Sequence, residues 1–286
     1  MGLFRMDTLM RAARAEGRAL PAFECWDSNS VQAIATAARQ SGRPVIFQAS
    51  ATEYGYCGGP DALAAMVRWY AEKYGVDGAL HLDHGSDLAQ VEACIAAGFT
   101  SVMLDASRAP FEENVRLTRE AVRMAEAADV SVEAELGHVA GAEAGLEEIA
   151  EHEAALTDPA EAARFVAETG CHCLAVAIGT VHGVYRGEPN IRTDRLAAIA
   201  EAVDVPLVLH GGSGTPADKI RECIRLGVAK INICTELQQA WLDSIGKVRA
   251  ERTISVPGLY YVPPFEALVG VMLDKIALFN RVPAQA

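Results

Sequence analysis

Eight short apolar segments alternate with helix-like segments along the chain, and this alternation most constrains the fold. Nearly all of them are uninterrupted apolar runs of the kind that form buried parallel strands, and the segments between them have helical spacing. The pattern predicts an α/β fold, a (β/α)8 TIM barrel, with a doubly wound open sheet as the alternative. The expected strands are 20–23, 45–50, 79–84, 100–106, 130–137, 174–179, 206–210 and 228–234.

Length and composition favour one large domain. The chain has 286 residues, 51% of them hydrophobic, which is enough for one core of barrel size. Neither a repeat nor a low-complexity linker divides it. We therefore expect a single barrel domain over 1–286, with an N-terminal helix at 7–16 and a C-terminal helix at about 265–280.

Net charge and apolar runs limit the partners. The 25 basic and 38 acidic residues give a net charge of −13, which argues against nucleic acid and anionic membranes. Any phosphate must then be held by local donors. No leader and no apolar run of about 18 residues is seen, so we expect a soluble, cytoplasmic protein with no membrane partner. The seven scattered cysteines suit reduced thiols, and Cys171 and Cys173 lack the second cysteine pair of a zinc site.

Three histidines end apolar runs and are each followed by glycine. They are His84 in LHLDHG, His182 in GTVHG and His210 in LVLHGG. In a barrel, all strand carboxyl ends face one rim, where the active site lies. Three neutral imidazoles with an open fourth position form a catalytic zinc arrangement, so we predict these three as metal ligands. The other histidines, His81, His138, His152 and His172, have no such placement and are left out of the site.

Other polar residues share this predicted rim. Asp105 and Glu135 end the fourth and fifth strands, where they could support the metal ligands, form an alternate metal position or bond loop amides. The run 211–216, GGSGTP, opens a helix with flexible residues whose backbone N–H groups can hold a phosphate. Gly183 and residues 232–235 can add donors. The full predicted rim comprises Ser50, Asp83, His84, Asp105, Glu135, His182, His210, Ser213, Asn232 and Thr235.

Five motifs together resemble one enzyme family. LHLDHG, SVEAELG, AVAIGTVHG, PLVLHGGSG and KINICTEL occur in this order between about Pro21 and Trp241. They are similar to those of the class II, zinc-dependent ketose-bisphosphate aldolases, in the tagatose- and fructose-bisphosphate branch. The resemblance implies reversible cleavage of a ketose phosphate to dihydroxyacetone phosphate and an aldehyde. It also implies Zn²⁺ on His84, His182 and His210, with Asp83 as the acid/base at the C4 hydroxyl.

The resemblance assigns further roles. It implies that Glu143, in the long acidic stretch after the fifth strand, removes the carbon-bound proton. It allows a monovalent cation, Na⁺ or K⁺, beside the phosphate, and family habit and the apolar last helix suggest a homodimer or homotetramer. The residues expected to bind the substrate and its phosphate are Ser50, Gly183, Gly211, Gly212, Ser213, Asn232, Cys234 and Thr235.

Two departures from the family pattern concern the far end of the substrate. Glu24 stands where members usually carry Asn, and residues 256–268 lack the arginine that meets the second phosphate. A carboxylate in place of an amide and a lost guanidinium both disfavour that phosphate. We therefore expect an aldehyde partner other than a standard phosphorylated sugar. The alternative is that another arginine, from elsewhere or from a neighbouring subunit, substitutes.

Two other functions compete with this one. Lys230 shares the Asn232 face of the eighth strand, so a Schiff-base aldolase is the nearest rival enzyme. From a different class, the chain could be a non-catalytic barrel that binds sugar phosphates. A lysine at position 230 suits a buried ion pair or a phosphate partner better than a Schiff base, and the sixth strand offers no lysine. The three histidines and Asp83 argue against the non-catalytic alternative.

Overall fold

The computed structural model describes residues 2–141, 156–185, 187, 189–251 and 256–280. Eight parallel strands close into a barrel in the order β1-β10-β9-β7-β5-β4-β3-β2, which confirms the predicted fold. Because β1 pairs with both β2 and β10, the sheet is closed and the doubly wound alternative is wrong. The strands are β1 (Leu20–Glu24), β2 (Val45–Ala49), β3 (Gly78–Gly85), β4 (Ser101–Leu104), β5 (Ser131–Leu136), β7 (Cys173–Val176), β9 (Leu207–Leu209) and β10 (Val228–Ile233).

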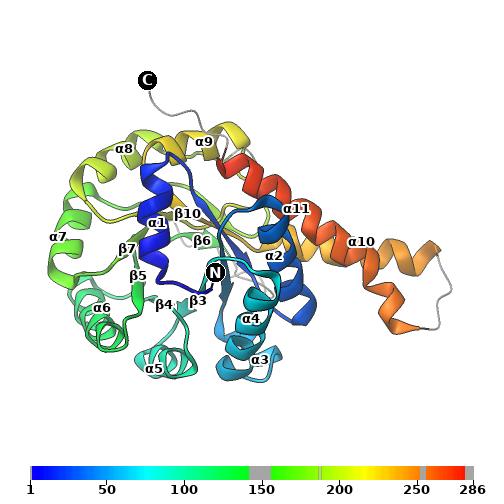
Figure 1. Ribbon diagram of the computed structural model, residues 1–286. Helices are drawn as coiled ribbons and strands as arrows, with labels where there is room; N and C mark the ends of the chain where they lie inside the picture. The colour runs from blue at the N-terminus through cyan, green and yellow to red at the C-terminus, as the bar shows by residue number, and fades with distance from the viewer. Residues whose placement is uncertain (1, 142–155, 186, 188, 252–255, 281–286) are drawn as a thin grey trace.

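Helices surround the barrel (Figure 1). Four of the eight outer helices follow a residue whose side chain accepts a backbone N–H of the first turn, and these residues are Asp27, Ser50, Asp87 and Asp158. Asp61, in contrast, lies in the first turn of its helix, after Pro60. The outer helices are α2 (Ser28–Ser41), α3 (Ala51–Tyr56), α4 (Pro60–Tyr74), α5 (Leu88–Ala97), α6 (Phe111–Glu126), α7 (Pro159–Thr169), α8 (Thr193–Ala202) and α9 (Ala217–Arg225).

The amino-terminal end of the barrel is closed by α1 (Met6–Ala15). Met6 and Met10 are fully buried and pack with Leu20, Ile46 and other residues near the strand starts. Figure 1 shows α1 lying across the barrel. With this end covered, the interior opens only toward the carboxyl ends of the strands.

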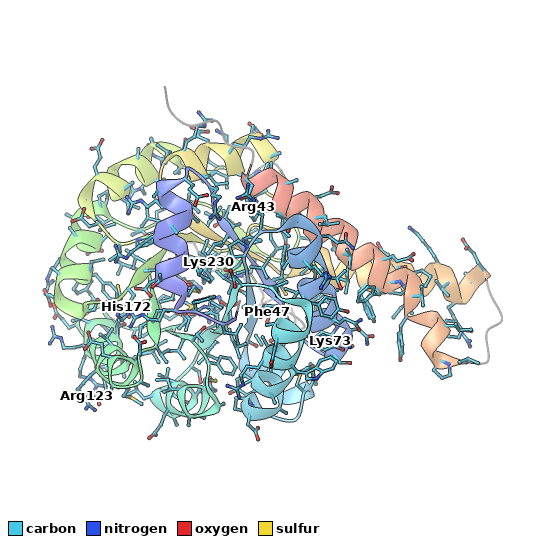
Figure 2. The ribbon with its side chains drawn as sticks, in the orientation of Figure 1. Arg43, Phe47, Lys73, Arg123, His172 and Lys230 are labelled. Atoms are coloured by element: carbon cyan, nitrogen blue, oxygen red, sulfur yellow. The ribbon has the colours of Figure 1, made fainter. Side chains whose placement is uncertain are left out.

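Strand alternation gives the barrel an apolar outer core and a partly polar interior. On β2, Phe47 packs in the outer core beneath the helices, whereas Gln48 is fully buried next to interior polar groups. The interior also holds His81, Glu133 and Lys230, all with no exposed surface. Figure 2 places Lys230 within the barrel and Arg123 on its outer wall. Polar side chains inside a barrel require mutual partners, and these shape the site above them.

Two carboxyl-terminal helices project from the barrel as an arm (Figure 1). These are α10 (Thr235–Glu251) and α11 (Val262–Asn280), which pack on each other, and α11 also contacts α2. A short 3-10 helix, η1 (Pro257–Tyr260), precedes α11, which begins three residues before the predicted start. None of the described helices is long and apolar enough to cross a membrane.

Candidate active site

A pocket of about 700 Å³ opens at the carboxyl ends of the barrel strands. This is the rim that the sequence predicts, and most of the predicted residues meet there. The lining comes from β1, β2, β3 and β10, from the start of α3 and of α10, and from His182, Gly183, Gly211 and Ser213, which end or follow two further strands. Its residues are Glu24, Gln48, Ser50, Thr52, Glu53, Asp83, His182, Gly183, Gly211, Ser213, Asn232, Cys234 and Thr235.

The three predicted metal ligands lie together. The ring centroids of His84 and His210 are 4.6 Å apart, those of His84 and His182 5.2 Å, and those of His182 and His210 5.7 Å. One nitrogen from each ring lies within 4.8 Å of the others. The residues come from β3, from the two-residue strand β8 (Val181–His182) and from the residue after β9.

A bulge in β3 aims His84 at this cluster. The pairing of β3 with β4 shifts between Leu82 and Gly85, so β3 carries one extra residue. His84 has a φ of 44°, in the left-handed region that a β-strand does not use. In a regular strand, Asp83 and His84 would point to opposite faces. The bulge lets both neighbours reach the same pocket, and its strain marks a functional position.

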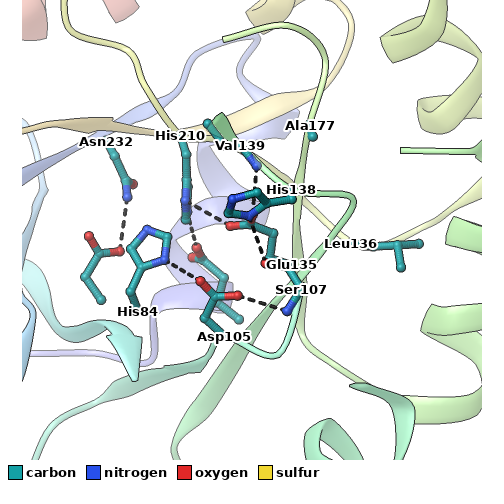
Figure 3. Close-up of polar contacts among 12 residues, drawn as sticks. His84, Asp105, Ser107, Glu135, Leu136, His138, Val139, Ala177, His210 and Asn232 are labelled. Carbon is teal, nitrogen blue, oxygen red and sulfur yellow. Dashed lines mark hydrogen bonds and ion pairs between the residues drawn. The ribbon is translucent and has the colours of Figure 1, made fainter. Parts of the chain in front are cut away.

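His84 is held by Asp105, as Figure 3 shows. Its Nδ1 lies 2.8 Å from Asp105 Oδ2, and the backbone N–H of Ser107 donates to the other carboxylate oxygen at 3.0 Å. Burial opposes ionisation, but the hydrogen bond with His84 holds the pKa of Asp105 well below its usual value. A carboxylate on Nδ1 leaves Nε2 as the metal-binding nitrogen of that ring.

Glu135 lies on the other side of the cluster. Its Oε2 is 3.3 Å from His210 Nδ1, and its Oε1 accepts the Val139 N–H at 3.2 Å (Figure 3). His138, omitted from the predicted site, stands 3.9 Å from the same carboxylate. Oxygen and nitrogen atoms of His84, Asp105 and Glu135 also lie within 4.8 Å of one another. Asp105 and Glu135 therefore bond loop amides, contact the histidines and border a possible alternate metal position, all in one place.

His210 is held by Glu133, which lies in the barrel interior. Its Nε2 lies 2.9 Å from Glu133 Oε1 inside the barrel, and the whole ring is buried. Burial lowers the pKa of His210, but the neighbouring carboxylates of Glu133 and Glu135 outweigh it and raise the value to about 9. Within the described residues, Nδ1 is buried and makes no hydrogen bond. Three imidazoles, each with a nitrogen within 4.8 Å of the others, form the kind of donor set that Zn²⁺ takes, so these residues fit the metal.

Asp83 borders the pocket beside the imidazoles. Asn232 Nδ2 donates to one carboxylate oxygen and Gln48 Nε2 to the other, each at 3.1 Å. Gln48 also donates to Glu24 at 3.0 Å, and Glu24 accepts the backbone N–H of Ser50 at 3.2 Å. The hydroxyl of Ser50 in turn bonds Glu53. One wall of the pocket therefore presents the carboxylates of Asp83, Glu24 and Glu53.

The pocket lining also contains most of the predicted phosphate-binding residues, which are Gly183, Gly211, Ser213, Asn232, Cys234 and Thr235. Gly211 has a φ of +67°, and a Cβ there would lie 2.4 Å from the Val181 carbonyl oxygen. Only glycine fits such a close approach. Gly212 is not among the residues that line the pocket. Its N–H donates to the Asn232 carbonyl oxygen at 3.1 Å and joins the segment after β9 to β10.

Three further sequence predictions concern Glu143, Lys230 and the pair Cys171 and Cys173. Glu143 lies outside the described residues, although Gly141, in the two-residue strand β6 (Ala140–Gly141), pairs with His182. Lys230 points inward as expected, but it is fully buried, its Nζ lies 2.9 Å from Glu133, and it is not among the residues that line the pocket. Cys171 and Cys173 are buried, and His172 Nδ1 accepts the Val132 N–H at 2.9 Å, a structural role.

Sequence reasoning missed four polar residues of the site, His81, Glu133, Gln48 and Glu53. The signal for the first three was present, because each is a polar residue between apolar neighbours in a predicted buried strand. In a parallel barrel such a residue must point into the interior or be paired. Glu53 follows β2 in the short helix α3, which the sequence pattern did not indicate.

Comparisons with known proteins agree over almost the full length. A family model described as "Fructose-bisphosphate aldolase class-II" matches residues 4–282. A protein of Bacillus subtilis (strain 168) named "Probable fructose-bisphosphate aldolase" is 39% identical over 283 residues, 98% of each chain.

Two solved structures of aldolases are also similar to this chain. The YdjI aldolase from Escherichia coli K12 is 34% identical with a TM-score of 0.85, over 98% of both chains. The fructose-bisphosphate aldolase of Campylobacter jejuni is 26% identical with a TM-score of 0.80, over 98% of this chain and 96% of that one.

Proposed function

The chain belongs to the class II fructose-bisphosphate aldolase family, an aldehyde-lyase family, and from this premise we propose how its site works. We propose that it cleaves a ketose phosphate reversibly to dihydroxyacetone phosphate and an aldehyde, with Zn²⁺ held by His84, His182 and His210. The convergence of these three imidazoles at the pocket is the observation that carries the proposal.

The metal and its ligands have separable tasks. Zinc in this position would act as a Lewis acid that stabilises the negative charge developing when the carbon–carbon bond breaks. Asp105 and Glu133 hold two of the ligating rings in fixed orientations through hydrogen bonds of 2.8 and 2.9 Å. Because the protein supplies only three of four ligands, the fourth position on the metal would be open to the substrate.

Asp83 is the proposed acid/base at the C4 hydroxyl. Two neutral amide donors, from Gln48 and Asn232, orient its carboxylate without neutralising it. It can therefore take the hydroxyl proton during cleavage and return it to the aldehyde oxygen during condensation. Its place at the pocket wall, beside the imidazoles, supports this role.

Glu143 is the proposed group that exchanges the carbon-bound proton of the triose phosphate. Support comes from Gly141, which lies two residues before Glu143 in the sequence and pairs with His182. Two residues of chain span at most about 7 Å, so the segment starts next to a proposed metal ligand. A carboxylate distinct from Asp83 lets the acid and base steps use separate groups.

The triose-phosphate end is assigned to the wall of Gly183, Gly211, Ser213 and residues 234–235. Thr235 begins α10, and a helix N-terminus favours an anion. Ser50 and Asn232 complete the proposed substrate contacts, Gly212 supports this wall from behind, and a Na⁺ or K⁺ ion beside the phosphate is part of the proposal. Backbone donors suit a protein with a net charge of −13.

The aldehyde end is proposed to take a partner without a phosphate. Glu24 and Glu53 are almost fully buried on that side of the pocket, near Asp83. Among the described residues that line the pocket, none is lysine or arginine. Like charges 4 Å apart repel by about 4 kcal/mol at an effective dielectric constant of 20. Carboxylates accept hydrogen bonds from sugar hydroxyls, so an uncharged hydroxyaldehyde suits this wall better.

Assembly and location complete the proposal. Apolar side chains on the α10–α11 arm, including Leu242 and Leu259, are more than half exposed. They favour a homodimer or homotetramer in which the arm contacts a second copy. All seven cysteines are thiols, which suits the cytoplasm.

The test is a dihydroxyacetone-phosphate release assay on zinc-loaded protein. We expect ketose 1-phosphates to be cleaved with a kcat/KM at least about tenfold above that of fructose or tagatose bisphosphate. A tenfold difference needs only about 1.4 kcal/mol, well below the repulsion of about 4 kcal/mol that one like-charge contact would add. Efficient cleavage of either bisphosphate would refute the proposed aldehyde end while leaving the aldolase itself intact. A zinc-loaded sample without turnover on the whole panel would favour the non-catalytic alternative.

A further inference from the structure

A buried ion pair lies directly beneath the proposed metal site. Glu133 on β5 and Lys230 on β10 have no exposed surface, and Lys230 Nζ lies 2.9 and 3.1 Å from the two Glu133 oxygens. The same carboxylate bonds His210 Nε2 at 2.9 Å. The chain of contacts therefore runs from a buried ammonium, through a carboxylate, to an imidazole that borders the site.

The ammonium is what lets the carboxylate remain charged at this depth. An isolated carboxylate inside a barrel is strongly disfavoured, and a charged partner in contact offsets the cost. Lys230 supplies that partner, because its Nζ is in contact with both oxygens of the fully buried Glu133 carboxylate. The other buried neighbour, His81, is 3.6 Å away and bonds Ser101 through Nδ1.

The carboxylates that hold His84 and His210 have different surroundings, and the difference shows what Lys230 contributes. Asp105, which holds His84, has a side chain 21% exposed and receives the Ser107 N–H. Glu133, which holds His210, is fully buried and receives the Lys230 ammonium instead. Solvent and a backbone amide can keep a partly exposed carboxylate ionised, whereas a buried one needs a cation.

We propose that Lys230 is a positioning residue for the metal site: with Glu133 it fixes the Nε2–H of His210 downward, so that Nδ1 presents its lone pair to the metal. Glu133 accepts one hydrogen bond from the ring, which sets both its orientation and the nitrogen that carries the proton. This inference rests on the proposed metal site, and it gives Lys230 a role that involves no contact with substrate.

The experiment compares zinc affinity and thermal stability in three variants. These are Lys230→Met, Glu133→Gln and the double variant, with zinc affinity measured by competition against a chromophoric chelator. Each single variant leaves one buried charge without its partner, so we expect a lower Tm and zinc binding weakened about 10- to 100-fold. In the double variant the interior is neutral, so we expect Tm to recover while zinc binding stays at least about tenfold weaker.

That divergence separates positioning from a purely structural role. If the double variant recovers both Tm and zinc affinity, or if affinity follows Tm in all three variants, the proposal is wrong. The matched control replaces the exposed pair Glu120 and Arg123 on α6, 2.5 Å apart, by Gln and Met. That double variant should leave both quantities unchanged.

A second measurement applies to the unaltered protein, in case the variants fail to fold. In the zinc-loaded wild type, ¹⁵N-resolved NMR of the imidazoles should show His210 bound to zinc through Nδ1, with a slowly exchanging Nε2–H. Binding through Nε2 would overturn the inference. A wild-type protein that binds no zinc would instead refute the proposed function, so the two failures are distinct.

Discussion

At the residue scale, the site is built from pairs in which a second side chain fixes the first. Asp105 orients His84, Glu133 orients His210, and Gln48 with Asn232 orients Asp83. Asp105 and Glu133 are not among the residues that line the pocket, whereas Gln48 and Asn232 line it together with Asp83. Fixed partners reduce the reorganisation that a reaction would otherwise require.

The proposed acid/base role of Asp83 predicts that replacing it lowers kcat without changing metal binding. Asp83→Asn keeps the shape but removes the proton acceptor, so kcat for cleavage should fall about 10²- to 10⁴-fold. Zinc content, measured by mass spectrometry, should stay at the wild-type level because the three imidazoles are untouched.

Asp87→Asn is the matched control for this variant. Asp87 caps α5 by accepting the Gln90 N–H at 2.9 Å, and Asn caps a helix equally well. Its kcat should be unchanged. A near-normal kcat in Asp83→Asn, or loss of its zinc, would contradict the assignment.

At the element scale, the β3 bulge determines whether Asp83 and His84 can share a pocket. The extra residue depends on Gly85, where a Cβ would lie 2.5 Å from the Met103 carbonyl oxygen. A backbone atom cannot move aside as a flexible side chain can. The glycine therefore holds β3 close to β4 at the point where the strand changes register.

Gly85→Ala should consequently damage both folding and metal binding. Overpacking against β4 should lower the free energy of unfolding by about 1 to 3 kcal/mol, measured by urea titration. Because the bulge aims His84, zinc affinity should fall as well.

Gly246→Ala, in the interior of α10 with no atom within 4 Å of the new Cβ, is the control. It should be neutral or stabilise the protein by up to about 1 kcal/mol. Wild-type stability and zinc affinity in Gly85→Ala would show that the bulge does not position the ligand.

The sequence was sufficient for the strands and for the three imidazoles, because both depend on local patterns. Apolar runs ending in His-Gly predicted His84, His182 and His210, and closure of the barrel brought them together. The bulge was not predictable, since alternation places Asp83 and His84 on opposite faces. The contacts of Lys230 with Glu133 join β10 to β5, 97 residues apart, and no local pattern encodes such a pairing.

At the scale of the whole molecule, an arm extends from a closed barrel. The barrel accounts for the pocket, whereas part of the α10–α11 arm lies beyond it (Figure 1). Because α11 also packs on α2 and β1, we propose that the chain folds as one domain. The arm's exposed apolar residues then remain available for contact with a second copy.

This arrangement predicts that charges on the arm reduce the oligomer to a 30.4 kDa monomer. The variant Leu242→Glu/Leu259→Glu places a carboxylate at two positions that are 65% and 53% exposed, so the monomer fold should tolerate it. Light scattering after size exclusion gives the mass.

Trp69→Gln alters an exposed aromatic residue on α4, outside the arm, and should keep the wild-type mass. An arm variant with the wild-type mass would contradict the assignment of the interface to the arm.

Anomalous X-ray diffraction at the zinc absorption edge, from crystals of zinc-loaded protein, tests the central claim most directly. The account predicts one strong peak about 2.0 to 2.1 Å from a ring nitrogen of each of His84, His182 and His210. A map with no peak among these rings, or with the ion bound elsewhere, would contradict it.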